Sequence, residues 1–366
     1  MVAGGGPAGS ATALALRRRG VSDVLLVEAG DYQGVRFGES IPPETRLLLD
    51  ALGVWQDFLH QGHEPCLGSC STWASDHPGY NDFLFNPHGH GWHLDRRRFD
   101  AWLADRAVAA GVERCDQTRL DGVERLGEQD IGLRLSSAGG SRLVRARFVV
   151  DATGSGARLA RSMGATRWLH DTLAYVAAFL EQPAVSDLSR LTLLEAVEYG
   201  WWYAARLPAG RVAVAVASDV AFVKREALNQ RNAWRARLGE TRHIGGALAG
   251  CTAGDERLWV RTARSCRLDR ASGPGWLAVG DAAASCDPIS SRGIYHALHD
   301  GLQAAETIVA WLAGAPQALE RYNAMIIARY DEYVRQRNHF YAIEQRWPSA
   351  PFWARRRSTA TAVPPR

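Results

Sequence analysis

Three glycines near the start of the chain have the G-x-G-x-x-G spacing of a phosphate-binding turn: Gly4, Gly6 and Gly9. At such a turn the missing side chains let the backbone approach a pyrophosphate, and the free amides of the following helix face the anion. About 20 residues further on, Glu28 is placed where a carboxylate accepts hydrogen bonds from a ribose. The glycines alone also fit an ordinary loop, but together with Glu28 they predict a dinucleotide-binding unit.

Two later segments carry polar residues directly after an apolar stretch: VVDATGSGAR, which begins at Val149, and AVGDAAASCDPISSRG, which begins at Ala278. Asp281 follows the second apolar stretch, and open α/β sheets bind ligands at the carboxyl ends of their parallel strands. Pro288 then begins a helix whose free amides suit an anionic oxygen. We expect these segments to meet the glycine turn at one site.

The residues around the glycine turn predict a strand, a helix and a second strand. SATALALRRRG is an alanine- and leucine-rich helix that stops at Gly20, and VLLVEAG is a parallel strand that reaches Glu28. Only Met1, Val2 and Ala3 precede the turn, and they cannot fill a typical strand of about five or six residues. We therefore expect that the natural start lies further upstream and that the chain as given holds its cofactor less well.

A second sheet is predicted between the two polar segments. Four stretches there are rich in β-branched and aromatic residues and are separated by turn signals: TLAYVAAFLE, LTLLEAVEYG, WWYAARLP and RVAVAVASD. A long helix follows over about 318–346 and ends at RWPSAPFW. The sequence thus predicts an α/β fold, in which a Rossmann-like dinucleotide-binding domain carries an inserted antiparallel β-sheet substrate domain and a long C-terminal helix.

The expected domain boundaries follow from these elements. The dinucleotide-binding domain comprises residues 1–65, 90–165 and 266–314, and the substrate domain comprises residues 66–89 and 166–265. A C-terminal helical segment covers residues 315–352, and a disordered tail covers residues 353–366.

Composition and spacing argue against several classes of partner. The net charge of +4 over 366 residues is small, so no nucleic-acid partner is expected. No apolar run approaches the roughly 18 residues of a membrane span and no secretory signal is recognised, which predicts a cytoplasmic protein without a membrane partner. The six cysteines form no C-x-x-C pair, and His88, His90 and His93 lie among turn residues, so no metal is expected.

Taken in order, GGGPAG, Glu28, DATG and GDAAA followed by DPISSRG resemble the glutathione-reductase-type FAD fold of aromatic hydroxylases and tryptophan-halogenase-like flavoproteins. The resemblance extends over nearly the whole chain through GESIPP, HLDRRRFD, GWWYAARLP, ERYNAMIIARY and IEQRWPSAPFW. It is closest to the non-halogenating branch that includes the maturation monooxygenase of quinohaemoprotein amine dehydrogenase. The resemblance implies FAD as the cofactor.

The resemblance also implies roles for individual residues. The pyrophosphate would lie at the glycine turn, the adenosine ribose at Glu28, a phosphate near Arg96, the ribityl chain at Asp281 and the flavin ring at the ISSRG loop. Arg36 would lie near the ring, although it also fits a solvated loop. The implied cofactor-binding residues are Gly4, Gly6, Pro7, Ala8, Gly9, Glu28, Ala29, Arg36, Ser40, Arg96, Ala152, Gly154, Gly280, Asp281, Pro288, Ser291, Gly293 and Ile294.

The scarcity of lysine bears on the reaction. Halogenases of this family use a lysine downstream of a motif like GESIPP to capture hypohalous acid, but residues 39–102 contain no lysine, and Lys224 is the only lysine in the chain. Arginine keeps its proton and cannot replace a neutral amine. The W-x-W-x-I-P signature is also altered to WWYAARLP. Halogenation is therefore disfavoured.

The expected activity is that of an FAD-dependent monooxygenase. Reduced flavin and O2 form a C4a-hydroperoxide, which hydroxylates an aromatic or indolic ring on a small molecule, a peptide or a carrier. Electrons would come from NAD(P)H or from a separate flavin reductase. Two alternatives remain: a geranylgeranyl-reductase-type FAD reductase, and a flavoprotein that binds a partner without catalysis. O2 consumption is expected of the monooxygenase and distinguishes it from both.

The catalytic candidates are Glu39, Ser40 and His296. The resemblance places the first two, in the RFGES segment, near the flavin, and histidine ordinarily has a pKa that suits a base near neutral pH. The substrate candidates are Trp201, Trp202 and Tyr203, which would form a flat wall for an aromatic ring. An aromatic cluster within the core explains these three residues equally well.

Overall fold

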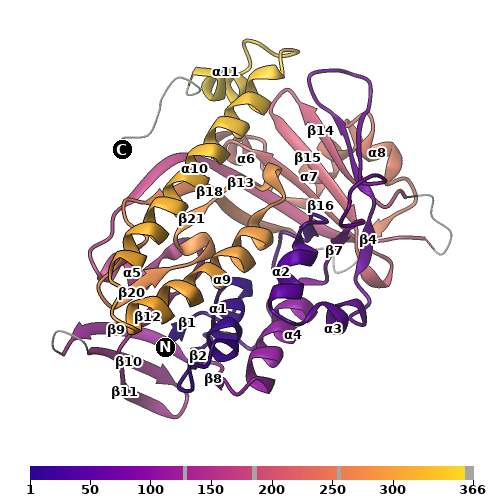
Figure 1. The fold of residues 1–366 in the computed structure, drawn as a ribbon. Helices are drawn as coiled ribbons and strands as arrows, with labels where there is room; N and C mark the ends of the chain where they lie inside the picture. The colour runs from indigo at the N-terminus through magenta and orange to yellow at the C-terminus, as the bar shows by residue number, and fades with distance from the viewer. Residues whose placement is uncertain (127–129, 184–187, 254–256, 359–366) are drawn as a thin grey trace.

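The computed structural model describes residues 1–126, 130–183, 188–253 and 257–358 of the chain. Its two large sheets are a six-stranded sheet near the N-terminus and a nine-stranded sheet built mainly from the middle of the chain (Figure 1). Two three-stranded sheets flank them. One contains β9 (Arg119–Arg125), β10 (Ile131–Ser137) and β11 (Gly140–Ala146), and the other contains β3 (Ser40–Ile41), β4 (Glu64–Cys66) and β7 (Gly91–His93).

The six-stranded sheet has the order β19-β20-β12-β1-β2-β8, and only the β19–β20 pair is antiparallel. Its strands are β1 (Val2–Ala3), β2 (Leu25–Val27), β8 (Glu113–Cys115), β12 (Val149–Asp151), β19 (Ser272–Gly273) and β20 (Trp276–Ala278). The two-residue β1 lies in the middle of this sheet, paired with β12 on one side and β2 on the other. This parallel sheet is the predicted Rossmann-like unit.

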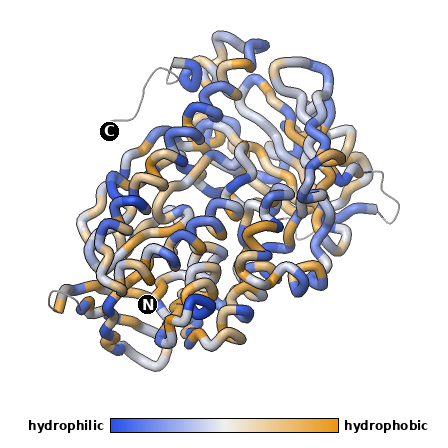
Figure 2. Tube along the Cα trace, in the orientation of Figure 1, coloured by the Kyte–Doolittle hydropathy of each residue, from blue (hydrophilic) through white to orange (hydrophobic). Residues whose placement is uncertain are grey.

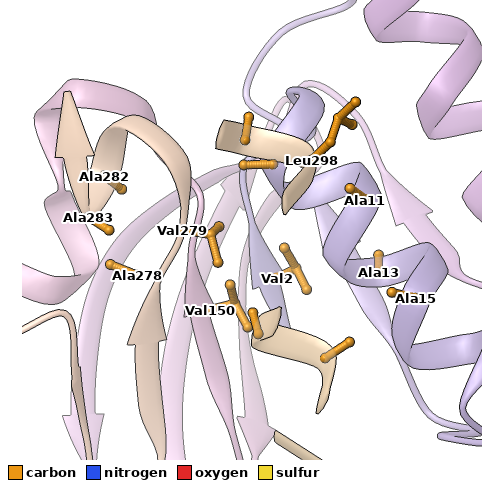
Figure 3. Close-up of a cluster of buried hydrophobic side chains, with 14 of the residues drawn as sticks. Val2, Ala11, Ala13, Ala15, Val150, Ala278, Val279, Ala282, Ala283 and Leu298 are labelled. Carbon is orange, nitrogen blue, oxygen red and sulfur yellow. The ribbon is translucent and has the colours of Figure 1, made fainter. Parts of the chain in front are cut away.

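Helices pack closely on this sheet because small residues line the contact. α1 (Pro7–Arg18) lies against α4 (Arg96–Ala109) and α9 (Gly293–Leu312). A side chain at Gly301 of α9 would place its Cβ 2.7 Å from the Cβ of Ala11 in α1. Figure 3 shows the buried cluster between these helices and the strands, which includes Val2, Val150 and Leu298. The shorter helices of the first half are α2 (Thr45–Ala51), α3 (Trp55–Leu59) and α5 (Arg158–Ser162).

The nine-stranded sheet runs in the order β21-β18-β13-β16-β15-β14-β5-β6, with β17 paired to β13. All of its pairs are antiparallel except β14–β5, which is parallel. Its strands are β5 (Gly68–Thr72), β6 (Gly79–Asp82), β13 (Arg167–Glu181), β14 (Leu191–Val197), β15 (Gly200–Arg206), β16 (Arg211–Ser218), β17 (Thr252–Ala253), β18 (Trp259–Leu268) and β21 (Ala284–Ser285). The predicted second sheet is thus present and larger than the sequence suggested.

The two faces of this sheet differ in composition, because successive strand residues point to opposite sides. In β16, the alternating RVAVAVAS directs alanines into one buried cluster and valines into another. The valine face is covered by α6 (Val220–Arg225), α7 (Arg231–Gly239) and α8 (Ile244–Ala247), since Val223, Trp234 and Ile244 belong to its cluster. The alanine face receives the C-terminal aromatic residues.

Two helices end the described chain. α10 (Gln317–Ile343) runs from the six-stranded sheet to the far end of the nine-stranded sheet, and α11 (Pro351–Ser358) follows it (Figure 1). Hydrophilic and hydrophobic stretches alternate along these outer helices (Figure 2). None of the helices in the described part of the chain is long and apolar enough to cross a membrane.

The expectation of a disordered tail from residue 353 is wrong for residues 353–358, which are helical. Pro351 begins this helix, a position that tolerates proline, and Phe352 and Trp353 are buried against Tyr341 of α10. Burial of these two aromatic rings holds the first part of the expected tail against α10. Residues 359–366 of the expected tail lie outside the described residues.

Candidate functional site

The predicted cofactor segments converge on one cavity of about 850 Å³. Its walls come from β1 and β2 of the six-stranded sheet, from the loop over residues 35–40, and from β13, β15 and β18 of the nine-stranded sheet. The predicted residues that line it are Gly4, Gly6, Pro7, Ala8, Glu28, Ala29, Arg36, Glu39, Ser40, Arg96, Ala152, Gly154, Trp201, Tyr203, Asp281, Pro288, Ser291, Gly293 and Ile294.

The glycine turn needs its glycines for close backbone packing. Gly4 has φ +112°, and a Cβ there would lie 2.1 Å from the carbonyl oxygen of Ala152. A Cβ on Gly9 would lie 1.8 Å from the carbonyl oxygen of Gly4. Gly9 does not line the cavity; its role is to let α1 start tightly against the turn. The turn therefore holds the N-terminus of α1 toward the cavity, as the sequence predicted.

Gly280 also acts behind the wall and does not line the cavity. It has φ +56°, and a Cβ there would come within 2.9 Å of the Cβ of Ala8. Its amide donates a hydrogen bond to Asp300 over 3.0 Å. Because both glycines pack beneath the surface that a ligand would touch, the prediction that Gly9 and Gly280 contact the cofactor is not supported by their positions.

Glu28 is a buried carboxylate fixed at the cavity edge. Its Oε2 accepts a hydrogen bond from the amide of Gly5 at 2.7 Å, and its Oε1 accepts one from the amide of Gly30 at 2.8 Å. Arg36 lies 3.6 Å from Oε1. A carboxylate has about four acceptor positions, so Glu28 keeps capacity for ribose hydroxyls.

Arg36 and Arg96 hold the loop over residues 35–38 against α4. Arg96 forms a two-pronged contact with Asp100, with both N···O distances 3.0 Å, and donates to the carbonyls of Phe37 and Gly38. Arg36 lies 3.4 Å from the same Asp100 carboxylate. Both guanidinium groups also line the cavity. The Arg36 side chain is 34% exposed while it pairs with Glu28 and Asp100, so it is a partly solvated loop residue that also borders the cavity.

Asp281 is open to the cavity but recessed among protein atoms. Burial raises the pKa of its carboxyl, and the charges of Arg96 and Arg329 act against this rise. Arg329 is itself paired with the buried Asp300 beneath the turn. The Asp281 carboxyl thus faces the cavity from the predicted strand end. The positive charges of Arg96 and Arg329 favour its ionised form.

Glu39 is a buried carboxyl in the lining of the cavity. It is 2% exposed, and burial raises the pKa of its carboxyl to about 7, although Arg96 and Arg211 act to lower it. Among the described residues its Oε1 has no hydrogen-bond partner. A buried oxygen without a partner costs free energy.

Ser40 joins the cavity wall to a buried polar chain. Its Oγ lies 3.0 Å from the hydroxyl of Tyr203 and 3.4 Å from Oγ1 of Thr192, which in turn lies 2.9 Å from Nε2 of His93. Burial holds the pKa of the Tyr203 phenol well above its usual range, so it stays neutral as a hydrogen-bonding group. Nε2 of His93 thus has a buried hydrogen-bond partner within the protein.

Trp201 and Tyr203 line the cavity, but Trp202 does not. Trp202 points to the valine face of the sheet, where its ring lies 5.2 Å from that of Trp234. The prediction of one wall formed by all three residues is therefore wrong, because neighbouring strand residues face opposite sides. Tyr175 of β13 completes the wall instead. The alternation of residues along TLAYVAAFLE was the sequence signal that could have identified Tyr175 as a wall residue.

His296 does not line the cavity, and the prediction that it is a base there is wrong. It lies on α9 with its ring 5.8 Å from that of Tyr295. Burial, with the nearby charge of Arg329, lowers the pKa of His296 to about 3, so its imidazole is neutral and a weak base. Its spacing after the ISSRG loop gave no information about the direction of its side chain.

These residues fit an FAD molecule. The glycine turn leaves backbone open to a pyrophosphate, Glu28 retains acceptor positions for a ribose, and Asp281 offers a carboxylate to a polyol chain. Glu39 lines the same cavity, and its buried Oε1 has no hydrogen-bond partner among the described residues. The flavin-edge loop from Pro288 to Gly293 contributes several lining residues.

A family model for tryptophan halogenase matches residues 1–69 and 70–365. The chain belongs to the tryptophan halogenase family. It is 30% identical to the putative FAD-dependent oxidoreductase LodB of Marinomonas mediterranea over 360 residues, which are 97% of this chain and 96% of LodB.

Solved structures support the same family fold. The myxobacterial chondrochloren halogenase CndH, described as a variant of FAD-dependent halogenases, superposes with a TM-score of 0.89 at 25% identity, over 97% of this chain and 84% of that one. The peptidyl tryptophan dihydroxylase QhpG superposes with a TM-score of 0.77 at 28% identity, over 97% of this chain and 77% of QhpG. The chain is thus an FAD-dependent oxidoreductase of this family.

Proposed function

We propose that this family member is an FAD-dependent monooxygenase of the non-halogenating branch, which hydroxylates an aromatic or indolic ring. Glu39 carries the proposal: its buried carboxyl has a pKa of about 7 and one unpartnered oxygen in a cavity walled by Trp201 and Tyr203. A carboxyl that ionises near neutral pH can take a proton from a ring as oxygen is added. Halogen capture by an amine is not supported, because Lys224 is the only lysine in the chain and does not line the cavity.

Each part of the cavity has a task in this reaction. The glycine turn, Glu28 and Asp281 bind the cofactor, and Arg96 supports them with a fixed positive charge. Bound FAD, once reduced and exposed to O2, supplies an electrophilic oxygen atom. Tyr175, Trp201 and Tyr203 orient a flat ring and exclude water, and Oε1 of Glu39 accepts its proton.

The substrate we propose is an indole carried by a peptide or protein. Support comes from QhpG, a peptidyl tryptophan dihydroxylase. This chain is 28% identical to it, and the match covers 97% of this chain. The electrons come from NAD(P)H or from a separate flavin reductase. A chemical reductant can reduce the bound FAD in a test without either of them.

The test uses FAD-loaded protein that is reduced anaerobically and then mixed with isotopically heavy O2, chloride, bromide and tryptophan-containing peptides. We expect a peptide that gains heavy oxygen, detected by mass spectrometry. Glu39→Gln should retain FAD and consume O2 while yielding less hydroxylated peptide. Glu320→Ala, at an exposed position of α10, is the matched control.

Other products would assign other functions. A halogenated peptide would show that halogenase chemistry proceeds without a cavity lysine. Saturation of a double bond without O2 consumption would identify a geranylgeranyl-reductase-type activity. If the reduced flavin consumes no O2 with any electron donor, the protein would be a flavoprotein that binds a partner without catalysis.

A further inference from the structure

A continuous set of aromatic rings links the cavity wall to the surface at the C-terminal helices. Nε1 of Trp201, which lines the cavity, donates a hydrogen bond to the hydroxyl of Tyr341 over 3.1 Å. The ring of Tyr341 lies 5.8 Å from that of Trp353. Trp353 lies 5.3 Å from Trp73 and 6.2 Å from Trp347.

Burial changes along this set from one end to the other. Trp201, Tyr341 and Trp353 are 1%, 0% and 0% exposed. Trp73 and Trp347 are only partly buried. The rings therefore lead from the cavity to solvent, with no gap between ring centres above 6.2 Å after the first hydrogen bond.

Tyr341 also has a partner that can take its proton. Its hydroxyl donates to Oδ2 of Asp287 over 2.8 Å, and the Asp287 side chain is fully buried at the cavity wall. Arg337 Nε lies 3.3 Å from the same oxygen. Indole and phenol are the side chains that lose an electron most readily, and a phenol does so more easily when an adjacent base accepts its proton. An aromatic ring that only fills the core does not need a base like Asp287 beside it.

We propose that Trp201, Tyr341, Trp353, Trp73 and Trp347 form a charge-transfer chain that carries oxidising equivalents out of the cavity, one electron at a time. The purpose rests on the proposed oxygen chemistry, because failed oxygen transfer leaves an oxidant where the substrate should be. That oxidant gains one electron from Trp201 and is reduced. Tyr341 returns an electron to Trp201 and passes its proton to Asp287.

The remaining steps restore every residue. Trp353 gives an electron to Tyr341, which takes its proton back from Asp287. Trp73 or Trp347 then reduces Trp353. A small thiol in solution gives one electron to that outer indole and releases its own proton to the solvent. The oxidised thiols pair as a disulfide, so two passages consume two thiols and two oxidant equivalents.

The experiment uses light and no substrate, so its result is independent of the monooxygenase reaction. Blue light converts oxidised FAD bound to the full chain into a one-electron oxidant in the cavity. Transient absorption then records tryptophan radicals, with and without a small thiol. We expect a long-lived radical that thiol shortens, and most of this signal should be lost in Trp353→Phe and in Tyr341→Phe.

The matched control is Trp234→Phe. Trp234 is a tryptophan 1% exposed that pairs with Trp202 on the other face of the same sheet and has no place in the chain. It should leave the radical signal unchanged. The double variant Trp73→Phe and Trp347→Phe should keep a radical that thiol no longer shortens. FAD absorbance and circular dichroism verify that each variant folds and binds FAD.

Two outcomes would overturn the proposal. One is a long-lived, thiol-sensitive radical that persists in Trp353→Phe with FAD bound. The other is an equal loss in Trp234→Phe, which would show that any buried tryptophan has the same effect. Loss of hydroxylation with an intact radical signal would instead count against the proposed function and leave the chain standing.

Discussion

The two faces of the nine-stranded sheet are made by the same strands but serve different ends. On the far face, Val212, Val214 and Val216 of β16 pack beneath helices, and Trp202 meets Trp234. On the cavity face the same strand presents alanines. These small residues leave room for large aromatic rings. One face is thus covered by α6, α7 and α8, and the other faces the cavity and the C-terminal helices.

Indole N–H groups are satisfied on both faces, as Trp201 shows on the cavity side, but the cavity side also holds a buried polar atom without a partner among the described residues. On the far face the indole Nε1 atoms of Trp202 and Trp234 donate to the Tyr199 hydroxyl and the Val176 carbonyl. On the cavity side Oε1 of Glu39 has no partner among the described residues. Satisfied groups on one face stabilise the fold, whereas the unsatisfied carboxyl raises the energy of the empty site and awaits a ligand. The difference predicts which substitutions change stability and which change binding.

The largest expected effect is on the far face. Trp234→Ala should lower the free energy of unfolding by about 3–5 kcal/mol, because it leaves a cavity under α7 and removes the contact with Trp202. Urea unfolding followed by circular dichroism measures this loss. The FAD affinity of the folded protein should not change. A weakened FAD affinity as large as that of a cavity variant would break the division between the faces.

Glu39→Gln tests the cavity face through pH. Burial raises the pKa of Glu39 from 4.5 to about 7, so the folded state binds more protons than the unfolded state between these values. Its contribution to stability is therefore full below pH of about 4.5 and falls by about 3 kcal/mol as pH rises through 7. Arg96 stays charged and the phenols of Tyr175 and Tyr203 stay neutral throughout, because their pKa values are raised.

Urea unfolding at a series of pH values should show that decline in the original chain and a flatter profile in Glu39→Gln. Trp234→Phe is the control, because it alters the far face and should retain the decline. The product yield should also rise with pH through about 7, where Glu39 becomes the ionised base. A variant with the same pH profile as the original chain would remove Glu39 from the reaction.

Asp281→Ala should have the next effect, on FAD binding. Loss of one charge-assisted hydrogen bond should weaken binding by about 1.5–3 kcal/mol, which is roughly 10- to 150-fold in Kd. Fluorescence titration with FAD measures the change. Glu320→Ala, which removes an exposed carboxylate from α10, should leave the Kd as it was. Equal affinities for the two variants would take Asp281 out of the cofactor site.

The sequence was sufficient for the glycine turn because its constraint is local. Gly4 and Gly9 must let the backbone of neighbouring residues approach, and that requirement is written in their spacing. Glu28 and Asp281 follow strands, and strand ends in a parallel sheet share one edge. These residues could therefore be placed at one cavity without knowing how the side chains pack.

The face of the sheet to which each side chain points could not be predicted in the same way. The alternation of β15 separates Trp202 from Trp201 and Tyr203, but only the packed helices decide which face is covered. His296 also depends on the rotation of α9, which the spacing of histidines does not fix. Trp353 was missed because burial of one aromatic pair outweighs the composition of the surrounding tail.

Lys224→Arg should have the smallest effect and tests the reaction itself. This residue is exposed on α6, whose Val223 packs into the far-face cluster. An amine at that position has no access to a ring held between Trp201 and Tyr203 on the opposite face. The yield and identity of the oxidised peptide should be unchanged by mass spectrometry, because arginine keeps the charge and only the neutral-amine chemistry is removed. Loss of product would mean that lysine chemistry reaches across the sheet, and the separation of a stabilising face from a reacting face would no longer hold.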